Sequence, residues 1–236
     1  MSNHELPPFW ALIPAAGIGS RMRADRPKQY LQLANKTIIE HTLACFTGHP
    51  QIRGVVVSLA VDDPYWPSLP CANNPRIQRA DGGAERADSV LNGLLRLSEL
   101  GAEDQDWVLV HDAARPNLAR SDLDLLLVEL AADSVGGLLA VPARDTLKRA
   151  GADGRVQATV DRATIWQAFT PQMFRVGPLQ RALADALIAG VAVTDEASAM
   201  EWAGQAPRLI EGRADNIKVT RPEDLQNLSL LWQRRC

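Results

Sequence analysis

The chain has 236 residues, of which 46% are apolar and 22% are charged, and its formal net charge is −3 at pH 7. This composition is that of an ordinary soluble globular protein, and the charge argues against a nucleic acid or an acidic membrane as partner. Residues 1–8 have no basic start and no long apolar run, so we expect neither a signal peptide nor a membrane-spanning helix. The three cysteines, Cys45, Cys71 and Cys236, have no CxxC spacing, which favours a reducing, cytoplasmic location.

The first strong pattern is a short apolar run that ends in a loop of small residues. The run Phe9–Ile13 predicts a buried strand, and Ala15, Ala16, Gly17 and Gly19 follow it closely. Residues this small let backbone N–H groups approach a bound phosphate. The loop lacks both the third glycine of the dinucleotide fingerprint and the Gly-Lys-Ser/Thr ending of a P-loop. It therefore predicts a phosphate site of another kind, although a lone Gly-x-Gly also marks a simple tight turn.

Two cations lie just beyond this loop. Arg21 and Lys28 are seven residues apart, and Lys28 lies in the string Pro27–Tyr30. A backbone cradle with two cations suits a polyphosphate whose reacting phosphorus gains negative charge in the transition state. We therefore expect phosphoryl or nucleotidyl transfer at this end of the predicted strand.

The rest of the chain alternates between predicted strands and helices. Further strands are expected at 55–59, 77–80, 107–110, 137–141 and 208–211, and helices at 38–46, 87–100, 121–132, 178–189, 194–203 and 222–233. This alternation predicts an α/β fold with right-handed crossovers and a mostly parallel sheet. Ligands of such sheets bind beyond the carboxyl ends of the strands, where the first loop and Asp112 are expected to meet.

Residues 142–167 interrupt this alternation. The segments 145–149 and 155–160 predict two short strands joined by a Gly-rich turn. Such a hairpin is marginal in water unless it packs on its own domain or on a second subunit. No linker divides the sequence, so we expect residues 1–236 to form a single domain with a β-arm at about 142–167.

Two carboxylates are candidate magnesium ligands. The strand at 107–110 brings His111 and Asp112 to its carboxyl end, and Mg²⁺ prefers one or two protein carboxylates together with phosphate oxygens. Asp112 fits as such a ligand, as an acceptor from ribose hydroxyls, or simply as a turn-forming residue. Asp215 is the natural second carboxylate. The neighbouring His111 either tunes the site or is a hydrogen-bonded structural histidine.

Five strings of this sequence resemble a known family of nucleotidyltransferases, the 2-C-methyl-D-erythritol 4-phosphate cytidylyltransferases of the non-mevalonate isoprenoid pathway. The strings are Ala15–Met22 with Pro27–Tyr30, Gly82–Ser89, His111–Pro116, Thr194–Ala199 and Glu211–Thr220. The resemblance runs from Ala11 to about Leu225. It implies a Rossmann-like nucleotidyltransferase fold with helices on both faces of a twisted sheet. It also implies CMP transfer from CTP to 2-C-methyl-D-erythritol 4-phosphate, a divalent cation such as Mg²⁺, and a homodimer held by the β-arm.

The resemblance also implies a role for individual residues. The catalytic pair would be Arg21 and Lys28, and the metal ligands would be Asp112 and Asp215. The implied CTP-binding residues are Ala15, Ala16, Gly17, Gly19, Gly83, Ala84, Ser89, Asp112 and Lys218. The implied residues for the second substrate are Thr146, Arg162, Thr194 and Lys218. Ala84 stands where many relatives carry an acidic residue, a departure that costs little if the contact is made through the backbone.

Two other functions remain open at this point. A cytidylyltransferase for another polyol phosphate, such as ribitol 5-phosphate, would share the nucleotide loop and differ near Thr194 and in the arm. A catalytically silent nucleotide-binding regulator would bind CTP without turnover. The presence of Arg21, Lys28, Asp112 and Lys218 argues against the regulator.

Overall fold

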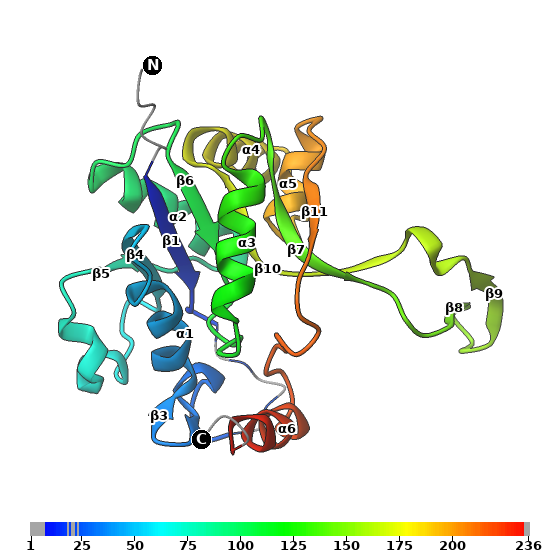
Figure 1. The fold of residues 1–236 in the computed structure, drawn as a ribbon, viewed down its shortest axis with the longest axis horizontal. Helices are drawn as coiled ribbons and strands as arrows, with labels where there is room; N and C mark the ends of the chain where they lie inside the picture. The colour runs from blue at the N-terminus through cyan, green and yellow to red at the C-terminus, as the bar shows by residue number, and fades with distance from the viewer. Residues whose placement is uncertain (1–7, 18, 20–21, 23, 234–236) are drawn as a thin grey trace.

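The computed structural model describes residues 8–17, 19, 22 and 24–233 of the chain. A twisted seven-stranded sheet lies at its centre (Figure 1). In spatial order the strands are β11 (Arg208–Glu211), β7 (Gly136–Pro142), β10 (Trp166–Arg175), β6 (Trp107–Val110), β1 (Phe9–Pro14), β4 (Ile52–Leu59) and β5 (Ile77–Asp81). Neighbouring strands are parallel, except that β10 runs antiparallel to β6 and β7. The predicted mostly parallel α/β sheet is confirmed.

Helices cover both faces of this sheet because its central strands are apolar on both sides. Along β1, Phe9, Ala11 and Ile13 join one buried cluster, whereas Trp10 and Leu12 join the other. This alternation follows from the two-residue period of a strand. Helices α1 (Ile38–Thr47) and α3 (Arg120–Leu130) pack on the first face, and α2 (Arg86–Glu99), α4 (Val176–Ile188) and α5 (Glu196–Trp202) pack on the second.

The sequence patterns did not predict strand β10. Its ladder with β7 is interrupted between Ala168 and Gln172, where Pro171 lies. Proline has no N–H to donate to a ladder, so a proline inside a run argues against a strand. In the folded chain, β10 tolerates this interruption because strands on both sides hold the remainder of it. The strand that returns the chain from the arm is thus a central part of the sheet.

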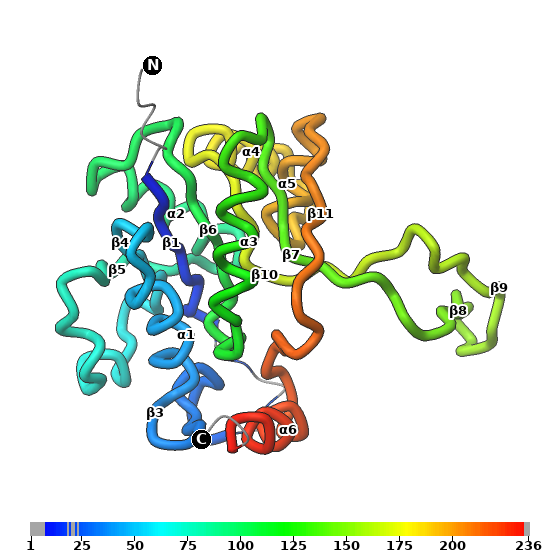
Figure 2. The backbone as a smooth tube through the Cα atoms, in the orientation of Figure 1, coloured from blue at the N-terminus to red at the C-terminus, as the bar shows by residue number. Residues whose placement is uncertain are grey.

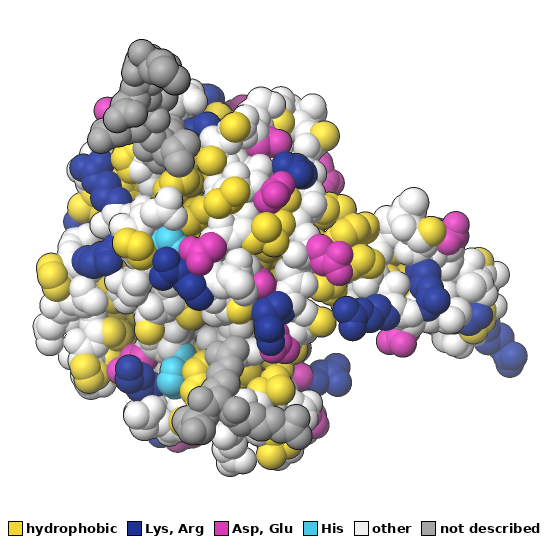
Figure 3. Space-filling view, in the orientation of Figure 1, with side chains coloured by type: hydrophobic (Ala, Val, Ile, Leu, Met, Phe, Trp, Pro, Cys, Tyr) yellow, Lys and Arg dark blue, Asp and Glu magenta, His cyan; other side chains and the backbone are white. Residues whose placement is uncertain are grey.

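The predicted hairpin projects away from the sheet as a separate arm. Strands β8 (Leu147–Ala150) and β9 (Val156–Val160) pair antiparallel with each other and with no strand of the main sheet. Two extended segments carry this pair outward from β7 and β10 (Figure 2). Lys and Arg side chains are prominent on the arm (Figure 3), and most of its residues are exposed.

The remaining elements are short or lie beyond the carboxyl end of the sheet. They are β2 (Gln32–Leu33), β3 (Lys36–Thr37), α6 (Pro222–Gln233) and the 3₁₀ turns at Lys28–Tyr30, Trp66–Ser68, Pro70–Asn73 and Arg162–Thr164. Helix α6 contributes Leu228 to a third buried cluster that also contains Met22 and Val219. Within the described part of the chain, none of the helices has both the length and the apolar character that crossing a membrane requires.

Candidate active site

The loop after β1 is held in shape by one buried side chain. The amide nitrogen of Gln29 donates to the backbone oxygens of Ala15, at 2.7 Å, and of Gly17, at 3.2 Å. Gln29 is only 3% exposed. Because these carbonyl oxygens are engaged by Gln29, they do not face an incoming anion. The loop can therefore present N–H groups and small side chains to a phosphate.

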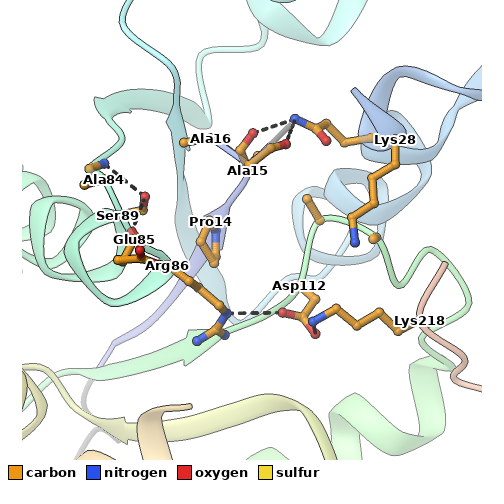
Figure 4. Close-up of a pocket in the computed structure, with 15 residues that line it drawn as sticks. Pro14, Ala15, Ala16, Lys28, Ala84, Glu85, Arg86, Ser89, Asp112 and Lys218 are labelled. Carbon is orange, nitrogen blue, oxygen red and sulfur yellow. Dashed lines mark hydrogen bonds and ion pairs between the residues drawn. The ribbon is translucent and has the colours of Figure 1, made fainter. Parts of the chain in front are cut away.

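Lys28 lies at the edge of the same loop. Gly19 has a φ of +67°, and an added Cβ there would come within 2.9 Å of the Lys28 Cγ atom. Only glycine adopts this backbone readily and leaves room for the lysine side chain. Two residues further on, the Tyr30 hydroxyl donates to Asp63 Oδ2 at 2.7 Å, which anchors the turn. The Lys28 ammonium group points into a cavity beneath the loop (Figure 4).

A second glycine-containing loop, residues 82–89, forms the opposite wall. The N–H of Gly83 donates to the hydroxyl of Ser89 at 3.0 Å, and that hydroxyl donates to the backbone oxygen of Glu85 at 3.1 Å. An added Cβ on Gly82 would lie 2.2 Å from the Cβ of Ala16. The two loops therefore touch, and glycine at position 82 permits this contact.

Asp112 lies between these loops, at the end of β6, and is surrounded by cations. Its carboxylate is 2.9 Å from Lys218 Nζ, 3.1 Å from Arg115 Nε and 3.4 Å from Arg86 Nε. Burial alone would raise the pKa of Asp112, but the charges of Arg86, Lys218 and Arg115 outweigh it and hold that pKa far below its usual range. The carboxylate is therefore ionised throughout the neutral pH range.

His111 is fully buried and is linked to Asp112 through the hydroxyl of Thr170. Its Nε2 lies 2.9 Å from the backbone oxygen of Arg115, and its Nδ1 lies 2.9 Å from the hydroxyl of Thr170. That hydroxyl also accepts the N–H of Asp112 at 3.1 Å. Burial lowers the pKa of His111 to about 4, so the ring is neutral at pH 7. It carries its proton on Nε2, because a carbonyl oxygen can only accept.

These residues line two adjoining cavities. Cavity A, of about 270 Å³, lies between the two loops, and its wall includes Ala15, Ala16, Gly17, Lys28, Gly83, Ala84, Ser89, Asp112 and Lys218. Cavity B, of about 210 Å³, lies towards β10 and α5, and its wall includes Arg115, Thr170, Gln172, Thr194 and Asp195. Arg86, Asp112 and Lys218 line both cavities. The arrangement suits two anionic ligands that meet at a shared boundary.

Comparisons with known proteins place this arrangement in a family. A family model described as 2-C-methyl-D-erythritol 4-phosphate cytidylyltransferase matches residues 9–233. A protein of that name from Pseudomonas putida (strain W619) is 74% identical over 230 residues, which cover 98% of each chain. A Francisella tularensis crystal structure of that name superposes with a TM-score of 0.81 at 36% identity, covering 96% of this chain and 99% of that one. A crystal structure of a 4-diphosphocytidyl-2C-methyl-D-erythritol synthase superposes with a TM-score of 0.83 at 42% sequence identity, covering 96% of this chain and 98% of that one.

The chain belongs to this cytidylyltransferase family. It is therefore a nucleotidyltransferase, as the five strings predicted. The nucleotide-side residues predicted for a cytidylyltransferase converge in cavity A, with the exception of Gly19, which packs against Lys28 instead. Thr194, predicted for the second substrate, lines cavity B with Asp112 and Lys218. Arg21 lies outside the residues that the structure describes.

Other residues predicted for the cytidylyltransferase site lie elsewhere. Thr146 and Arg162 are exposed on the arm and line neither cavity A nor cavity B. The carboxylate of Asp215 accepts two hydrogen bonds from Arg213, at 2.6 and 2.9 Å, and Asp215 also lines neither cavity. In residues 8–17, 19, 22 and 24–233, His, Cys, Asp and Glu side chains form no group of three that could hold a metal.

Sequence reasoning about the cytidylyltransferase site missed several residues. Gln29, Arg86 and Arg115 lie inside strings that resemble the family, yet no role was predicted for them, and Arg86 and Arg115 each have a partner more than 100 residues away. The clearest case is the pair of Arg86 with Glu196, 110 residues apart. The sequence did contain a clue to these three residues, since each lies within three positions of a residue whose role was predicted.

Proposed function

We propose that this chain transfers CMP from CTP to 2-C-methyl-D-erythritol 4-phosphate and releases pyrophosphate. The observation that carries this proposal is that cavities A and B adjoin and share Arg86, Asp112 and Lys218. A transferase of this kind must bind two phosphorylated substrates side by side, with a cation at their boundary. The names of the relatives support the identity of the second substrate.

In this proposal CTP occupies cavity A. The loop of Ala15, Ala16 and Gly17 binds the triphosphate, and Lys28 stabilises the negative charge that develops on the α-phosphate and on the departing pyrophosphate. Gly83, Ala84 and Ser89 contact the cytosine edge. Arg21, whose position the structure does not describe, is assigned the same role as Lys28 from the sequence alone.

The second substrate occupies cavity B, next to Thr194. An oxygen of its phosphate forms a new bond to the α-phosphorus of CTP, and the bond from that phosphorus to the bridging oxygen of the β-phosphate breaks. Pyrophosphate leaves with the electron pair. The attacking phosphate is already ionised at pH 7, so no general base is needed, and Lys218 aligns it beside Asp112.

A magnesium ion fits the donor chemistry of cavity A when CTP is present. Asp112 is an ionised carboxylate on the wall of cavity A, and Mg²⁺ commonly binds through one or two carboxylates with phosphate oxygens and water. Asp112 would hold the ion, which would neutralise part of the triphosphate charge. The structure offers no direct support for Asp215 as a second ligand, since Asp215 lines neither cavity.

The arm is proposed to serve a second copy of the chain. Thr146 and Arg162 are exposed on it, so in an isolated protomer they face solvent rather than cavity B. A homodimer in which each arm reaches the partner would bring these side chains to the partner's second substrate.

We also infer a cytoplasmic location, because both proposed substrates are charged phosphate esters that do not cross membranes unaided.

Pyrophosphate release from CTP and Mg²⁺ tests the function directly. The assay compares 2-C-methyl-D-erythritol 4-phosphate, ribitol 5-phosphate and no acceptor. Release with the methylerythritol phosphate alone is the expected result. Release with ribitol 5-phosphate instead would show that the enzyme is a cytidylyltransferase that uses a different acceptor from the one proposed. A folded protein that binds CTP and releases nothing with either acceptor would contradict the enzymatic function and favour a nucleotide-binding regulator.

A further inference from the structure

Arg86 connects the two cavities through an ion pair that none of the roles above uses. It is the first residue of α2 and lies within segment 82–89, which forms one wall of cavity A. Its Nη1 and Nη2 atoms lie 2.6 and 3.1 Å from the two carboxylate oxygens of Glu196. Its Nε atom lies 3.4 Å from Asp112 (Figure 4). One guanidinium group, carried by α2, thus contacts both the turn after β6 and the start of α5.

Glu196 is shielded from solvent in this ion pair, whereas the Arg86 side chain is 30% exposed. Glu196 is 1% exposed, and its side chain lies at the start of α5, directly after Thr194 and Asp195. Paired, bidentate guanidinium and carboxylate groups fix both the distance and the orientation of the elements that carry them. A substitution that removes Arg86 would leave the charge of Glu196 buried and uncompensated.

The charge balance argues against a simple phosphate-binding role for Arg86. Its positive charge is already matched at close range by the carboxylate of Glu196, and the carboxylate of Asp112 lies on its other side. A group neutralised in this way attracts an incoming triphosphate weakly compared with a cation that has no carboxylate beside it. Arg86 is therefore better suited to holding structure than to binding phosphate.

The start of α5 is held by a second contact from the sheet. The amide nitrogen of Gln172 donates to Asp195 Oδ2 at 2.8 Å, and its amide oxygen accepts the N–H of Ala197 at 2.8 Å. Gln172 lies on β10 and is 1% exposed. The Thr194 end of cavity B is thus fixed from one side by β10 and from the other by Arg86, which belongs to the wall of cavity A.

We infer that Arg86 is a positioning residue that couples the two cavities through its bidentate pair with Glu196. Ligand binding in cavity A orders the loop at 82–89 and the start of α2, and the ion pair transmits that order to residues 194–198 beside cavity B. This inference rests on the proposed function for the identity of the ligands. By thermodynamic reciprocity, the acceptor must strengthen CTP binding by the same factor as CTP strengthens acceptor binding.

Hydrogen exchange of the backbone amides tests this coupling without an acceptor. In the wild-type protein, CTP with Mg²⁺ is expected to slow exchange both at 82–89 and at 194–198. In Glu196→Gln, which keeps the side-chain shape and removes the charge, protection should persist at 82–89 and disappear at 194–198. Arg86→Lys keeps the charge and loses the bidentate geometry, so it should retain part of the effect.

A control removes a more exposed Arg–Glu ion pair that lines neither cavity. Glu129 pairs with Arg208 at 2.8 Å on the outer edge of the sheet, and Glu129→Gln should leave the CTP-induced protection unchanged in both segments. If CTP does not slow exchange at 194–198 in the wild type, or if Glu196→Gln keeps that protection, the coupling is overturned. This readout does not depend on which acceptor the enzyme uses.

Binding measurements separate this inference from the proposed function. With a non-hydrolysable CTP analogue, the affinity for 2-C-methyl-D-erythritol 4-phosphate should rise in the wild type by about fivefold or more. In Glu196→Gln, the CTP analogue should raise the affinity for 2-C-methyl-D-erythritol 4-phosphate little or not at all. A wild type that makes no product would contradict the proposed function but would leave the exchange result standing. Variants that lose affinity for each ligand alone and keep the coupling factor would show a merely structural role.

Discussion

At the scale of single residues, the site depends on side chains that set the position of other groups. Gln29 engages two carbonyl oxygens of the phosphate loop, His111 links Thr170 to the Arg115 backbone, and Arg86 links two cavities. Lys28 differs from these residues, because its ammonium group points into cavity A itself. Substitutions at the two kinds of position should therefore affect different steps of the reaction.

Lys28→Ala should chiefly slow the chemical step. Loss of a cation that stabilises developing charge costs roughly 10²- to 10³-fold in kcat. The apparent affinity for CTP should change much less, because the loop and the cytosine contacts remain. Steady-state kinetics with saturating acceptor measure both quantities, and Lys36→Ala, an exposed lysine in the β2–β3 hairpin, serves as the control. A Lys28→Ala variant with nearly wild-type turnover would show that Lys28 is not a catalytic residue.

Gln29→Glu should instead weaken CTP binding. The new carboxylate would face the backbone oxygens of Ala15 and Gly17 without a proton to donate, so the loop must shift. Leaving such buried groups unsatisfied costs about 1–3 kcal/mol, or roughly 10- to 100-fold in CTP affinity. Calorimetric titration with CTP measures this change. Gln32→Glu, at an exposed position nearby, should bind CTP normally, and equal losses in both variants would contradict the role of Gln29.

At the scale of elements, the contact between the two loops of cavity A sets the width of the cavity. Gly82→Ala would place a methyl group 2.2 Å from the Cβ of Ala16, so the loops must separate. We expect CTP affinity to fall by about tenfold or more, from loss of well-placed contacts on one wall. Gly48→Ala is a mild control, since its added Cβ would lie 3.1 Å from a single backbone oxygen. Unchanged CTP binding in Gly82→Ala would show that the loops do not need this contact.

The order of most elements could be predicted from the sequence, because it depends on local patterns. The apolar runs at β1, β4 and β6 and the periodic helices α1 and α2 all appear where they were expected. Strand β10 was missed because Pro171 and neighbouring polar residues break its pattern, whereas its partners β6 and β7 hold it in place. Local strand propensity does not include the hydrogen bonds and packing that strands from other parts of the chain provide, so it did not predict β10.

The candidate site could be predicted in part for the same reason. Loops that follow predicted strands, such as the one from Ala15 to Gly17 and the turn at Asp112, were placed at one edge of the sheet by topology alone. The pair of Arg86 with Glu196 could not be predicted, since it depends on how α2, α4 and α5 pack together on one face of the sheet. The resemblance to the family supplied the roles of Thr146 and Arg162, which a single protomer leaves exposed.

At the scale of the whole molecule, the arm decides whether the active site belongs to one chain or two. If each arm serves the partner, an Arg162→Ala variant and a Lys28→Ala variant should complement each other when mixed. Random exchange of subunits would make about half of the dimers mixed, each with one intact site, which restores about a quarter of the wild-type activity. Each variant alone should be nearly inactive with the methylerythritol phosphate.

The mixing experiment has a clear opposite outcome. If Arg162 acts on the cavity of its own chain, no mixture of the two variants can contain an intact site, and activity should stay at the level of the single variants. Sedimentation of the wild-type protein establishes whether the dimer exists at the assay concentration. A monomer that is fully active would contradict the role of the arm in the partner's site.

Strand β10 gives the arm a mechanical connection to the chemistry. The chain leaves the arm along this strand, and four of its residues, Ala168, Phe169, Thr170 and Gln172, form part of the wall of cavity B. Thr170 and Gln172 in turn hold Asp112 and the start of α5. The arm and this wall of cavity B are thus joined by a single strand, so we expect a partner that binds the arm to change the shape of cavity B as well.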